Sequence, residues 1–354
     1  MQVVANVMKT VMVTGGCGFI GSNFVRLLAR EPGWRIINFD KLTYAGNLEN
    51  VADVASDRTK FVQGDICDRA LVERILKEEK PWAVVNFAAE SHVDRSILDA
   101  SPFVQTNIGG VQSLLEAVRK YPVDRFLHIS TDEVYGDKEG KEPSTEESSL
   151  SPSSPYAATK AAADLLCFSF CRTYGLPIIV TRSSNNYGPY QFPEKLIPLL
   201  IRNGLNGLEL PVYGDGKQIR DWLFVEDNCR AILGVLETGK VGSIYNIGTS
   251  EERTNLDVVH GICAAIALRH GAESENLEAR IRFVTDRPGH DRRYALDTTK
   301  VRTEIGWKPR AVFVTGLKQT VDWYLDHSEW ISRVTSGEYR KYYDSVYAQA
   351  WGTT

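Results

Sequence analysis

Short apolar runs alternate with longer amphipathic segments through the first half of the chain. The runs are rich in β-branched residues and occupy residues 10–14, 35–40, 60–65, 83–90, 125–131 and 177–182. Helix-length segments separate most of them, including 68–79, 101–119 and 156–173, and a further helix is expected from near Phe19. Such alternation predicts βαβ units. We therefore expect an α/β fold with a doubly wound parallel sheet and helices on both faces.

The pattern changes after residue 182, which predicts a smaller mixed α/β domain made of residues 183–220 and 251–313. Its first stretch, SSNNYGPYQFPEKLIP, is rich in Asn, Pro and Tyr and is typical of a loop. Residues 1–182 then form the larger domain. Two later segments are predicted to return to it: residues 221–250, which contain the strand-like run SIYNIG, and the amphipathic helix 314–333. Residues 334–354 form an aromatic-rich C-terminal tail.

Composition and charge argue against several classes of partner. The 354 residues are 43% hydrophobic and 24% charged, which is ordinary for a globular protein. A net charge of −4 without a long basic run argues against nucleic acid or an anionic membrane as the main partner. No apolar stretch is long enough to span a bilayer, and the first ten residues lack the features of a secretory signal.

The six cysteines favour a reduced protein. None forms a C-x-x-C pair. Cys167 and Cys171 lie four apart on a predicted helix, a spacing that could hold a metal, but no histidine or carboxylate completes a ligand set. We therefore predict buried thiols, no metal site and a cytoplasmic location.

A glycine-rich stretch follows the first predicted strand. VMVTGGCGFIGS places Gly15, Gly18 and Gly21 between that strand and the next helix. The three glycines suit a tight turn, a close approach by pyrophosphate and a close helix–strand contact. Asp40 ends the second strand, where a carboxylate would accept hydrogen bonds from a ribose diol and repel a 2′-phosphate. The sequence thus predicts a Rossmann-like domain that binds NAD rather than NADP; a glycine turn without a ligand is the alternative.

The ends of the next two strands are predicted to border the same crevice. Asp65 and Ile66 follow the third strand, and residues 88–91 (Ala88, Ala89, Glu90 and Ser91) follow the fourth. The carboxyl ends of parallel strands line the ligand crevice in such sheets. For each residue taken singly, simple capping of a strand explains its presence almost as well.

Two side-chain pairs supply candidate chemistry. YAATK places Tyr156 and Lys160 four apart, on one face if the segment is helical. A lysine ammonium would lower the pKa of the phenol and let it take a proton from an alcohol while hydride leaves the same carbon. HISTDEVYGD places Asp132 beside Glu133 where a strand runs into a turn. Neighbouring carboxyls split their pKa values, which permits one acid and one base; a solvated turn is the competing interpretation.

Together these residues resemble the extended short-chain dehydrogenase/reductase family. Longer blocks narrow the resemblance to the dTDP-glucose 4,6-dehydratases: DKLTYAGN (40–47), AAESHVDRS (88–96), STDEVYGD (130–137), SSNNYGPYQFPEKLIP (183–198), RDWLFVED (220–227) and DRPGHDRRYA (286–295). The resemblance implies a hydro-lyase that converts dTDP-glucose to dTDP-4-keto-6-deoxyglucose with NAD as cofactor. It places the reaction early in the synthesis of deoxysugars such as rhamnose.

The resemblance also implies a role for each catalytic candidate. The C4 hydroxyl is oxidised first, with Tyr156 taking its proton beside Lys160 while Thr131 binds the oxygen. The new ketone acidifies C5, so Glu133 as base removes the C5 proton and Asp132 as acid protonates the departing C6 hydroxyl. Hydride then returns to C6, which regenerates NAD, and C5 is reprotonated.

The binding residues implied by the resemblance fall into two sets. The cofactor set is Gly15, Gly18, Phe19, Ile20, Gly21, Asp40, Lys41, Leu42, Thr43, Asp65, Ile66, Phe87, Ala88, Ala89, Ser91, Thr106, Tyr156, Lys160 and Asn186. The substrate set is Ser91, Thr131, Asn185, Lys195, Leu196, Pro211, Tyr213, Arg220, Asn255, Asp286, Arg287 and His290. The guanidinium of Arg220 suits a diphosphate; for Lys195 and Arg220 a solvated surface charge is the alternative. Neither His92 nor His290 is assigned a metal or base role.

The expected partner is a nucleotide-sugar, together with a second copy of the chain. Helices 101–119 and 156–173 would form the homodimer contact, although their apolar faces equally fit ordinary core packing. A UDP-glucose 4,6-dehydratase, or a nucleotide-sugar epimerase or decarboxylase, is the alternative enzyme. A catalytically inactive NAD-responsive binding protein is the alternative from another class. The adjacent Asp132 and Glu133 favour water elimination over all of these except the UDP-glucose enzyme.

Overall fold

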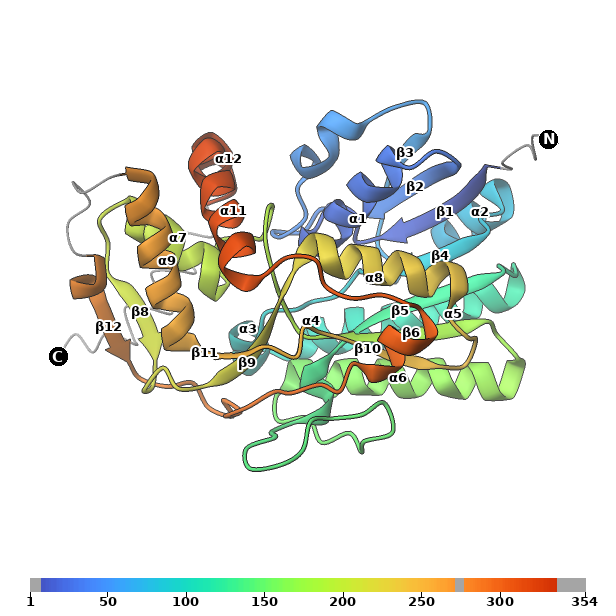
Figure 1. The fold of residues 1–354 in the computed structure, drawn as a ribbon. Helices are drawn as coiled ribbons and strands as arrows, with labels where there is room; N and C mark the ends of the chain where they lie inside the picture. Colours follow the sequence, from blue (N-terminus) through green and yellow to red (C-terminus); the bar gives the residue numbers. More distant parts are fainter. Residues whose placement is uncertain (1–7, 271–276, 336–354) are drawn as a thin grey trace.

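The computed structural model describes residues 8–270 and 277–335 (Figure 1). Its strands are β1 (Lys9–Thr14), β2 (Trp34–Asp40), β3 (Thr59–Gln63), β4 (Ala83–Asn86), β5 (Arg125–Thr131), β6 (Ile178–Ser183), β7 (Asn185–Tyr187), β8 (Leu210–Tyr213), β9 (Ile219–Phe224), β10 (Ile244–Ile247), β11 (Glu252–Thr254) and β12 (Ile281–Val284). Its α-helices are α1 (Phe19–Arg30), α2 (Arg69–Glu79), α3 (Val93–Leu98), α4 (Ser101–Phe103), α5 (Val111–Lys120), α6 (Pro155–Tyr174), α7 (Leu196–Leu205), α8 (Val225–Thr238), α9 (Asn255–His270), α10 (Thr299–Glu304), α11 (Phe313–Asp326) and α12 (Ser328–Val334). Short 3₁₀ or π segments are η1 (Leu48–Val54), η2 (Val104–Gly110), η3 (Asp132–Tyr135) and η4 (Leu277–Arg280).

Seven of the described strands form one parallel sheet in the order β10-β6-β5-β4-β1-β2-β3. The chain proceeds outward from β1 in one direction to β3 and then in the other direction from β4, so the strand order reverses between β1 and β4. In an open parallel sheet, ligands bind at the carboxyl ends of the strands beside such a reversal. The predicted doubly wound sheet is confirmed, and this reversal is where the glycine loop lies.

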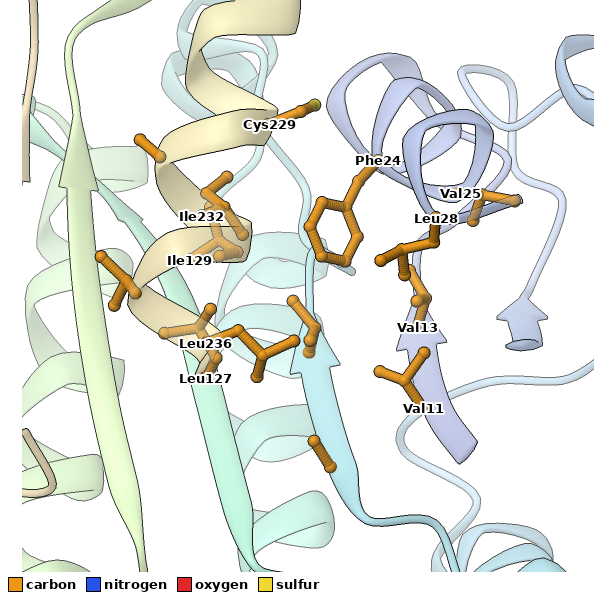
Figure 2. Packing of buried hydrophobic residues seen from close by; sticks show 14 of the residues in the cluster. Val11, Val13, Phe24, Val25, Leu28, Leu127, Ile129, Cys229, Ile232 and Leu236 are labelled. Atoms are coloured by element: carbon orange, nitrogen blue, oxygen red, sulfur yellow. The ribbon is translucent and has the colours of Figure 1, made fainter. Parts of the chain in front are cut away.

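Helices cover both faces of this sheet, and side-chain alternation along the strands decides which helices each residue meets. On one face, Val11 and Val13 of β1 belong to a cluster that includes residues of α1 and α8. Figure 2 shows Phe24 of α1 and Ile232 of α8 converging over this face. On the other face, Met12 packs with α2, α5 and α6. Burial of each large side chain contributes about 1.5–3 kcal/mol and holds the carboxyl edge of the sheet rigid.

A second, smaller unit lies beside the carboxyl edge of the sheet. It contains the mixed sheet β11-β9-β7, the parallel pair β12-β8, and helices α7, α9 and α11 around a separate apolar cluster. Figure 1 shows these helices grouped apart from the large sheet. A Rossmann-like domain with a smaller mixed α/β unit is therefore the observed architecture.

Two segments pack differently from the sequence-based domain division. Residues 314–333 were expected to join the larger domain, but α11 and α12 place Leu317, Val321 and Trp330 in the cluster of the smaller unit. Conversely, Val301 and Trp307, in a segment assigned to the smaller domain, pack with the large sheet and α8. An apolar stripe shows that a helix face is buried, but not against which neighbour. The return of 221–250 does occur for α8 and β10, whereas β9 joins the smaller sheet.

Several element boundaries also differ. The fourth strand ends at Asn86, so residues 87–90 are loop. The helix predicted over 101–119 contains the π-helical segment η2, and the helix predicted over 314–333 is divided at His327. The N-terminal residues 1–7 and most of the predicted tail, residues 336–354, lie outside the described residues.

Candidate active site

The glycine loop joins β1 to α1, and glycine is needed for a different reason at each of its three positions. Gly15 has φ of +69°, and a Cβ there would lie 2.6 Å from the backbone nitrogen of Ala88. A Cβ on Gly21 would collide with the carbonyl of Gly15, so Gly21 allows α1 to approach the loop. Gly18 has an ordinary φ of −77°, and its Cβ would come no nearer than 3.4 Å to the carbonyl oxygen of Gly15. The space beside Gly18 is therefore open at the N-terminus of α1, where an anion is stabilised.

Asp40 ends β2 with its carboxylate held by the backbone. Oδ2 accepts a hydrogen bond of 2.8 Å from the N–H of Cys17, and Oδ1 accepts one of 2.8 Å from the N–H of Leu42. Burial raises the pKa of Asp40, and the two backbone donors oppose that rise. Each carboxylate oxygen has a second acceptor position, so the oriented group can still accept hydrogen bonds from a ribose diol.

A cavity extends along the carboxyl ends of β1 to β5 from Asp40 to Tyr156. From the predicted cofactor set it is lined by Gly15, Gly18, Phe19, Ile20, Gly21, Asp40, Lys41, Thr43, Asp65, Ile66, Phe87, Ala88, Ala89, Ser91, Thr106, Tyr156 and Lys160. Leu42 is outside this lining but orients Asp40 through its N–H. Asn186 is placed elsewhere: it lines a second cavity, because β7 turns away from the large sheet. The open face of Gly18 and the oriented Asp40 carboxylate fit a dinucleotide.

Tyr156 and Lys160 lie one turn apart near the start of α6 and are both buried. Lys160 Nζ donates a hydrogen bond of 2.6 Å to the carbonyl of Ile129 in β5. The sequence-based expectation was a lowered pKa for Tyr156, but burial and the charge of Glu133 raise it, against a lowering contribution from the Thr131 hydroxyl. Burial and the nearby carboxylates both disfavour the phenolate, and the hydrogen bond from Thr131 only partly offsets them. Burial likewise lowers the pKa of Lys160 from 10.5 to about 8.

The chain turns directly after β5, and the turn carries the two adjacent carboxyls. Thr131 ends the strand and its Oγ1 accepts a hydrogen bond of 3.3 Å from the N–H of Glu133, which caps η3. Side chains of Asp132 and Glu133 would point to opposite faces of a strand, but a 3₁₀ turn allows both to approach one site. Among the described residues, Asp132 Oδ2 and Glu133 Oε2 are buried without a hydrogen-bond partner. Buried carboxyl oxygens normally have a hydrogen-bond partner, so these two are available to a ligand or to solvent.

The two carboxyls differ in their electrostatic surroundings. Burial and the charge of Glu133 raise the pKa of Asp132 well above its usual value. Burial also raises the pKa of Glu133, but the positive charges of Arg287, Arg220 and Lys195 oppose it. Asp132 is therefore favoured as the protonated member and Glu133 as the ionised member, which is the division that acid–base chemistry needs.

A second cavity opens between the large sheet and the smaller unit. From the predicted substrate set it is lined by Asn185, Lys195, Leu196, Pro211, Tyr213, Arg220, Asn255, Arg287 and His290. Glu133 lines it too, whereas Ser91 lines the first cavity. Gln191, Glu194 and Lys195 line both cavities, so the two adjoin. Thr131 and Asp132 are buried and are not among the described lining residues of either cavity.

Lys195 and Arg220, two cations of the predicted substrate set, donate hydrogen bonds to backbone carbonyls of the protein. Lys195 Nζ donates to the carbonyl of Ser91 at 2.8 Å. Arg220 is only 4% exposed, and its guanidinium donates to the carbonyls of Ile219 and Asp291 at 2.7 and 2.8 Å. Arg220 is therefore a buried charge rather than a solvated one, and part of its donor fork is left for a ligand.

Asp94 at the start of α3 is a residue that sequence reasoning missed. Its two carboxylate oxygens accept hydrogen bonds from Arg287 at 3.1 Å and from the hydroxyl of Tyr213 at 3.2 Å. Asp286 Oδ1 forms a hydrogen bond of 2.6 Å with His290 Nδ1. Further missed lining residues are Phe39, Ala45, Gly46, Gly64, Ile129, Ser130, Gln191, Phe192 and Glu194 of the first cavity, and His92, Val93, Ile197, Leu199, Trp222 and Val284 of the second. The ends of strands signalled some of these, but residues 191–194 carry no such signal.

The described residues contain no group of three or more His, Cys, Asp and Glu side chains that could hold a metal ion. In the same residues, no helix has the length and apolarity needed to cross a membrane.

A glycine loop, a strand-end aspartate and a Tyr–Lys pair at the carboxyl edge of a doubly wound sheet define a Rossmann-type oxidoreductase fold. A family model described as GDP-mannose 4,6 dehydratase matches residues 12–320. A dTDP-glucose 4,6-dehydratase of Xanthomonas campestris pv. campestris (strain B100) is 53% identical over 344 residues, covering 94% of this chain and 98% of that protein. The chain belongs to this family and, within it, to the dTDP-glucose 4,6-dehydratases.

Solved structures agree with this membership. The dTDP-glucose 4,6-dehydratase DesIV of Streptomyces venezuelae, solved with NAD bound, is similar with a TM-score of 0.86 and 46% identity. The corresponding enzyme of Bacillus anthracis str. Ames, in complex with NAD, has a TM-score of 0.84 and 46% identity. Each similarity covers 92% of this chain and 99% of the other.

Proposed function

We propose that the protein is a hydro-lyase that converts dTDP-glucose to dTDP-4-keto-6-deoxyglucose, with NAD as its cofactor. One observation carries this proposal: Asp132 and Glu133 share one turn beside the cationic cavity, where the charge of Glu133 adds to the burial that raises the pKa of Asp132, and three cations oppose the rise at Glu133. An enzyme that only transfers hydride and reverses C4 has no use for this second acid–base pair. Water elimination needs one base and one acid beside the same sugar.

The chain's residues divide the chemistry between two elements. On α6, Tyr156 takes the proton of the sugar O4, and Lys160 and Thr131 orient the phenol and that oxygen. When bound, NAD accepts and later returns a hydride, and its positively charged ring favours a phenolate nearby. On η3, Glu133 removes the C5 proton once C4 is a ketone, and Asp132 protonates the leaving C6 hydroxyl. After hydride has returned to C6, C5 is reprotonated. The cofactor set bordering the first cavity binds NAD in this scheme.

The second cavity holds the nucleotide diphosphate. Lys195, Arg220 and Arg287 place three cations near Glu133, which suits a diphosphate and opposes the rise that burial causes in the pKa of Glu133. Tyr213 stacks on the pyrimidine, and Asn185 and Ser91 contact the sugar. Asn186, as a lining residue of this cavity, contacts substrate rather than cofactor in this proposal.

The protein's setting follows from the same family. The product feeds deoxysugar synthesis such as that of rhamnose, in the cytoplasm, and the enzyme acts as a homodimer. Exposed apolar side chains support a subunit contact at the predicted helices: Leu165 of α6 is 60% exposed and Val104 of η2 is 50% exposed. Paired helices with such faces form stable subunit contacts.

Mass spectrometry of purified protein incubated separately with dTDP-glucose and UDP-glucose tests the function. We expect loss of one water from dTDP-glucose in preference to UDP-glucose. Equal turnover of both would retain the reaction and overturn the thymidine assignment. A 4-epimer without mass change, or no change with protein shown to hold NAD, would overturn the dehydratase proposal.

A further inference from the structure

A buried polar network lies behind the turn that carries Asp132 and Glu133. At the far end of η3, the hydroxyl of Tyr135 accepts a hydrogen bond of 2.8 Å from Arg182 Nη1 in β6. The same hydroxyl donates one of 2.8 Å to Asn246 Oδ1 in β10. Tyr135, Arg182 and Asn246 are at most 2% exposed. The hydroxyl thus ties the turn to two neighbouring strands of the sheet.

Further hydrogen bonds hold Arg182 and Asn246, the two partners of Tyr135, in their orientations. Arg182 Nε donates to Asp164 Oδ2 at 2.9 Å, so its guanidinium cannot rotate without leaving a buried carboxylate unpaired. Asp164 follows Lys160 by one turn of α6, on the same buried face. Asn246 Nδ2 donates to the carbonyls of Ser144 and Asp297, which orients its Oδ1 toward Tyr135.

The network therefore connects the two catalytic elements. Arg182 joins α6, which carries Tyr156 and Lys160, to the turn that carries the two carboxyls. A 3₁₀ turn of four residues has few internal hydrogen bonds, so its own backbone cannot fix the carboxyl positions to within a fraction of an ångström. Productive proton transfer needs that accuracy.

We propose that Tyr135 is a positioning residue, whose hydroxyl, held by Arg182 and Asn246, sets the place of Asp132 and Glu133 relative to Tyr156. Tyr135 does not reach the substrate and takes no proton from it. The inference rests on the proposed function, since it concerns the elimination step. It goes further because it assigns to the elimination step a positioning residue that the oxidation step does not need.

The test is Tyr135→Phe, which removes one oxygen and keeps the ring in its apolar cluster with Ala161 and Leu296. Oxidation at C4 depends on α6 and continues, whereas water elimination slows. We expect kcat for dTDP-glucose to fall about 10- to 100-fold with KM nearly unchanged. Reduced nicotinamide, followed by its absorbance, should accumulate during turnover of the variant and not of the wild-type protein.

Tyr245→Phe is the matched control. Tyr245 is also buried, and its hydroxyl donates to Glu304 at 2.8 Å on the side of β10 away from the turn. This variant should lose a similar hydrogen bond but keep the wild-type kcat, and reduced nicotinamide should not accumulate in it. Arg182→Lys is a second variant, because one ammonium retains the charge opposite Asp164 but cannot bond both Asp164 and Tyr135. It should act in the same direction as Tyr135→Phe.

A substrate-independent measurement separates this inference from the proposed function. Amide hydrogen exchange of residues 131–136, on the protein as purified, should quicken in Tyr135→Phe and not in Tyr245→Phe. Failure of the wild-type protein to dehydrate dTDP-glucose would count against the proposed function only. Wild-type exchange and kcat in Tyr135→Phe, or lost turnover without accumulated reduced nicotinamide, would overturn the positioning role.

Discussion

The hydroxyl of Tyr213 donates a hydrogen bond of 3.2 Å to Asp94 Oδ2, although the two residues are 119 positions apart. Tyr213 belongs to the smaller unit and Asp94 to the loop and helix that follow β4. The other carboxylate oxygen of Asp94 accepts from Arg287 of the smaller unit at 3.1 Å. One carboxylate of the larger unit therefore orients two residues proposed to bind the nucleotide.

Replacing Asp94 by Asn should weaken nucleotide binding. Asparagine has one acceptor oxygen and no charge, so Arg287 loses its ion pair with residue 94, and the Tyr213 hydroxyl can only accept from the amide instead of donating to a carboxylate. We expect the Kd for dTDP, measured by calorimetry, to rise about tenfold, since a hydrogen bond to a charged group contributes about 1.5–3 kcal/mol. Asp53→Asn, which removes the exposed partner of Arg26, is the control and should leave the Kd unchanged. Tighter dTDP binding by Asp94→Asn would show that charge repulsion outweighs positioning.

Replacing Glu133 by Gln should remove the base for the C5 proton. Water loss should fall about 10²- to 10⁴-fold while dTDP still binds, because an amide cannot accept the proton. Asp132→Asn should also slow water loss but leave proton removal intact. In deuterated water, sugar recovered from Asp132→Asn should therefore carry deuterium at C5, and sugar from Glu133→Gln should not. The opposite labelling would exchange the two roles.

Gly18 and Gly21 should respond differently to alanine. A Cβ on Gly21 collides with the Gly15 carbonyl, so Gly21→Ala should lower the free energy of unfolding by ~1–3 kcal/mol. Gly18 has an ordinary φ and an open Cβ position, so Gly18→Ala should fold with nearly wild-type stability. Its methyl group would instead occupy space needed by pyrophosphate, and NAD affinity should fall at least about tenfold. Thermal unfolding and NAD titration distinguish the two; unchanged NAD affinity in Gly18→Ala would contradict the phosphate assignment.

Lys160 should make stability depend on alkaline pH. Burial lowers its pKa from 10.5 to about 8, so between these values the unfolded chain holds a proton that the folded protein has released. Stability rises with pH wherever the unfolded state binds more protons. Relative to Lys160→Met, the wild-type free energy of unfolding should therefore rise by about 3 kcal/mol from pH 8 to 10.5. Denaturant unfolding at several pH values measures this, and parallel curves for the two proteins would contradict the lowered pKa.

Local pattern was enough to predict much of the fold and of the first cavity. Strands β1 to β6 lie within a few residues of the predicted runs, because a strand buried on both faces has to be apolar along its whole length. The carboxyl ends of parallel strands share one edge, so the sequence pattern alone places Asp40 and Asp65 beside the glycine loop, and both line the first cavity. Predicted lining residues of the second cavity came from the family resemblance, since residues 185–290 have no such local rule.

The sequence by itself determined the strands of the first half, the glycine turn and the residue types available for catalysis, since these depend on side-chain periodicity and backbone sterics. Tertiary structure alone decided which unit received α11, that Asp94 would meet Tyr213 and Arg287, and that burial would raise rather than lower the pKa of Tyr156. The physical reason is that contact partners and desolvation depend on distances between residues far apart in the chain. A pattern of polar and apolar positions specifies that a face is buried, but it contains no information about the neighbour that buries it.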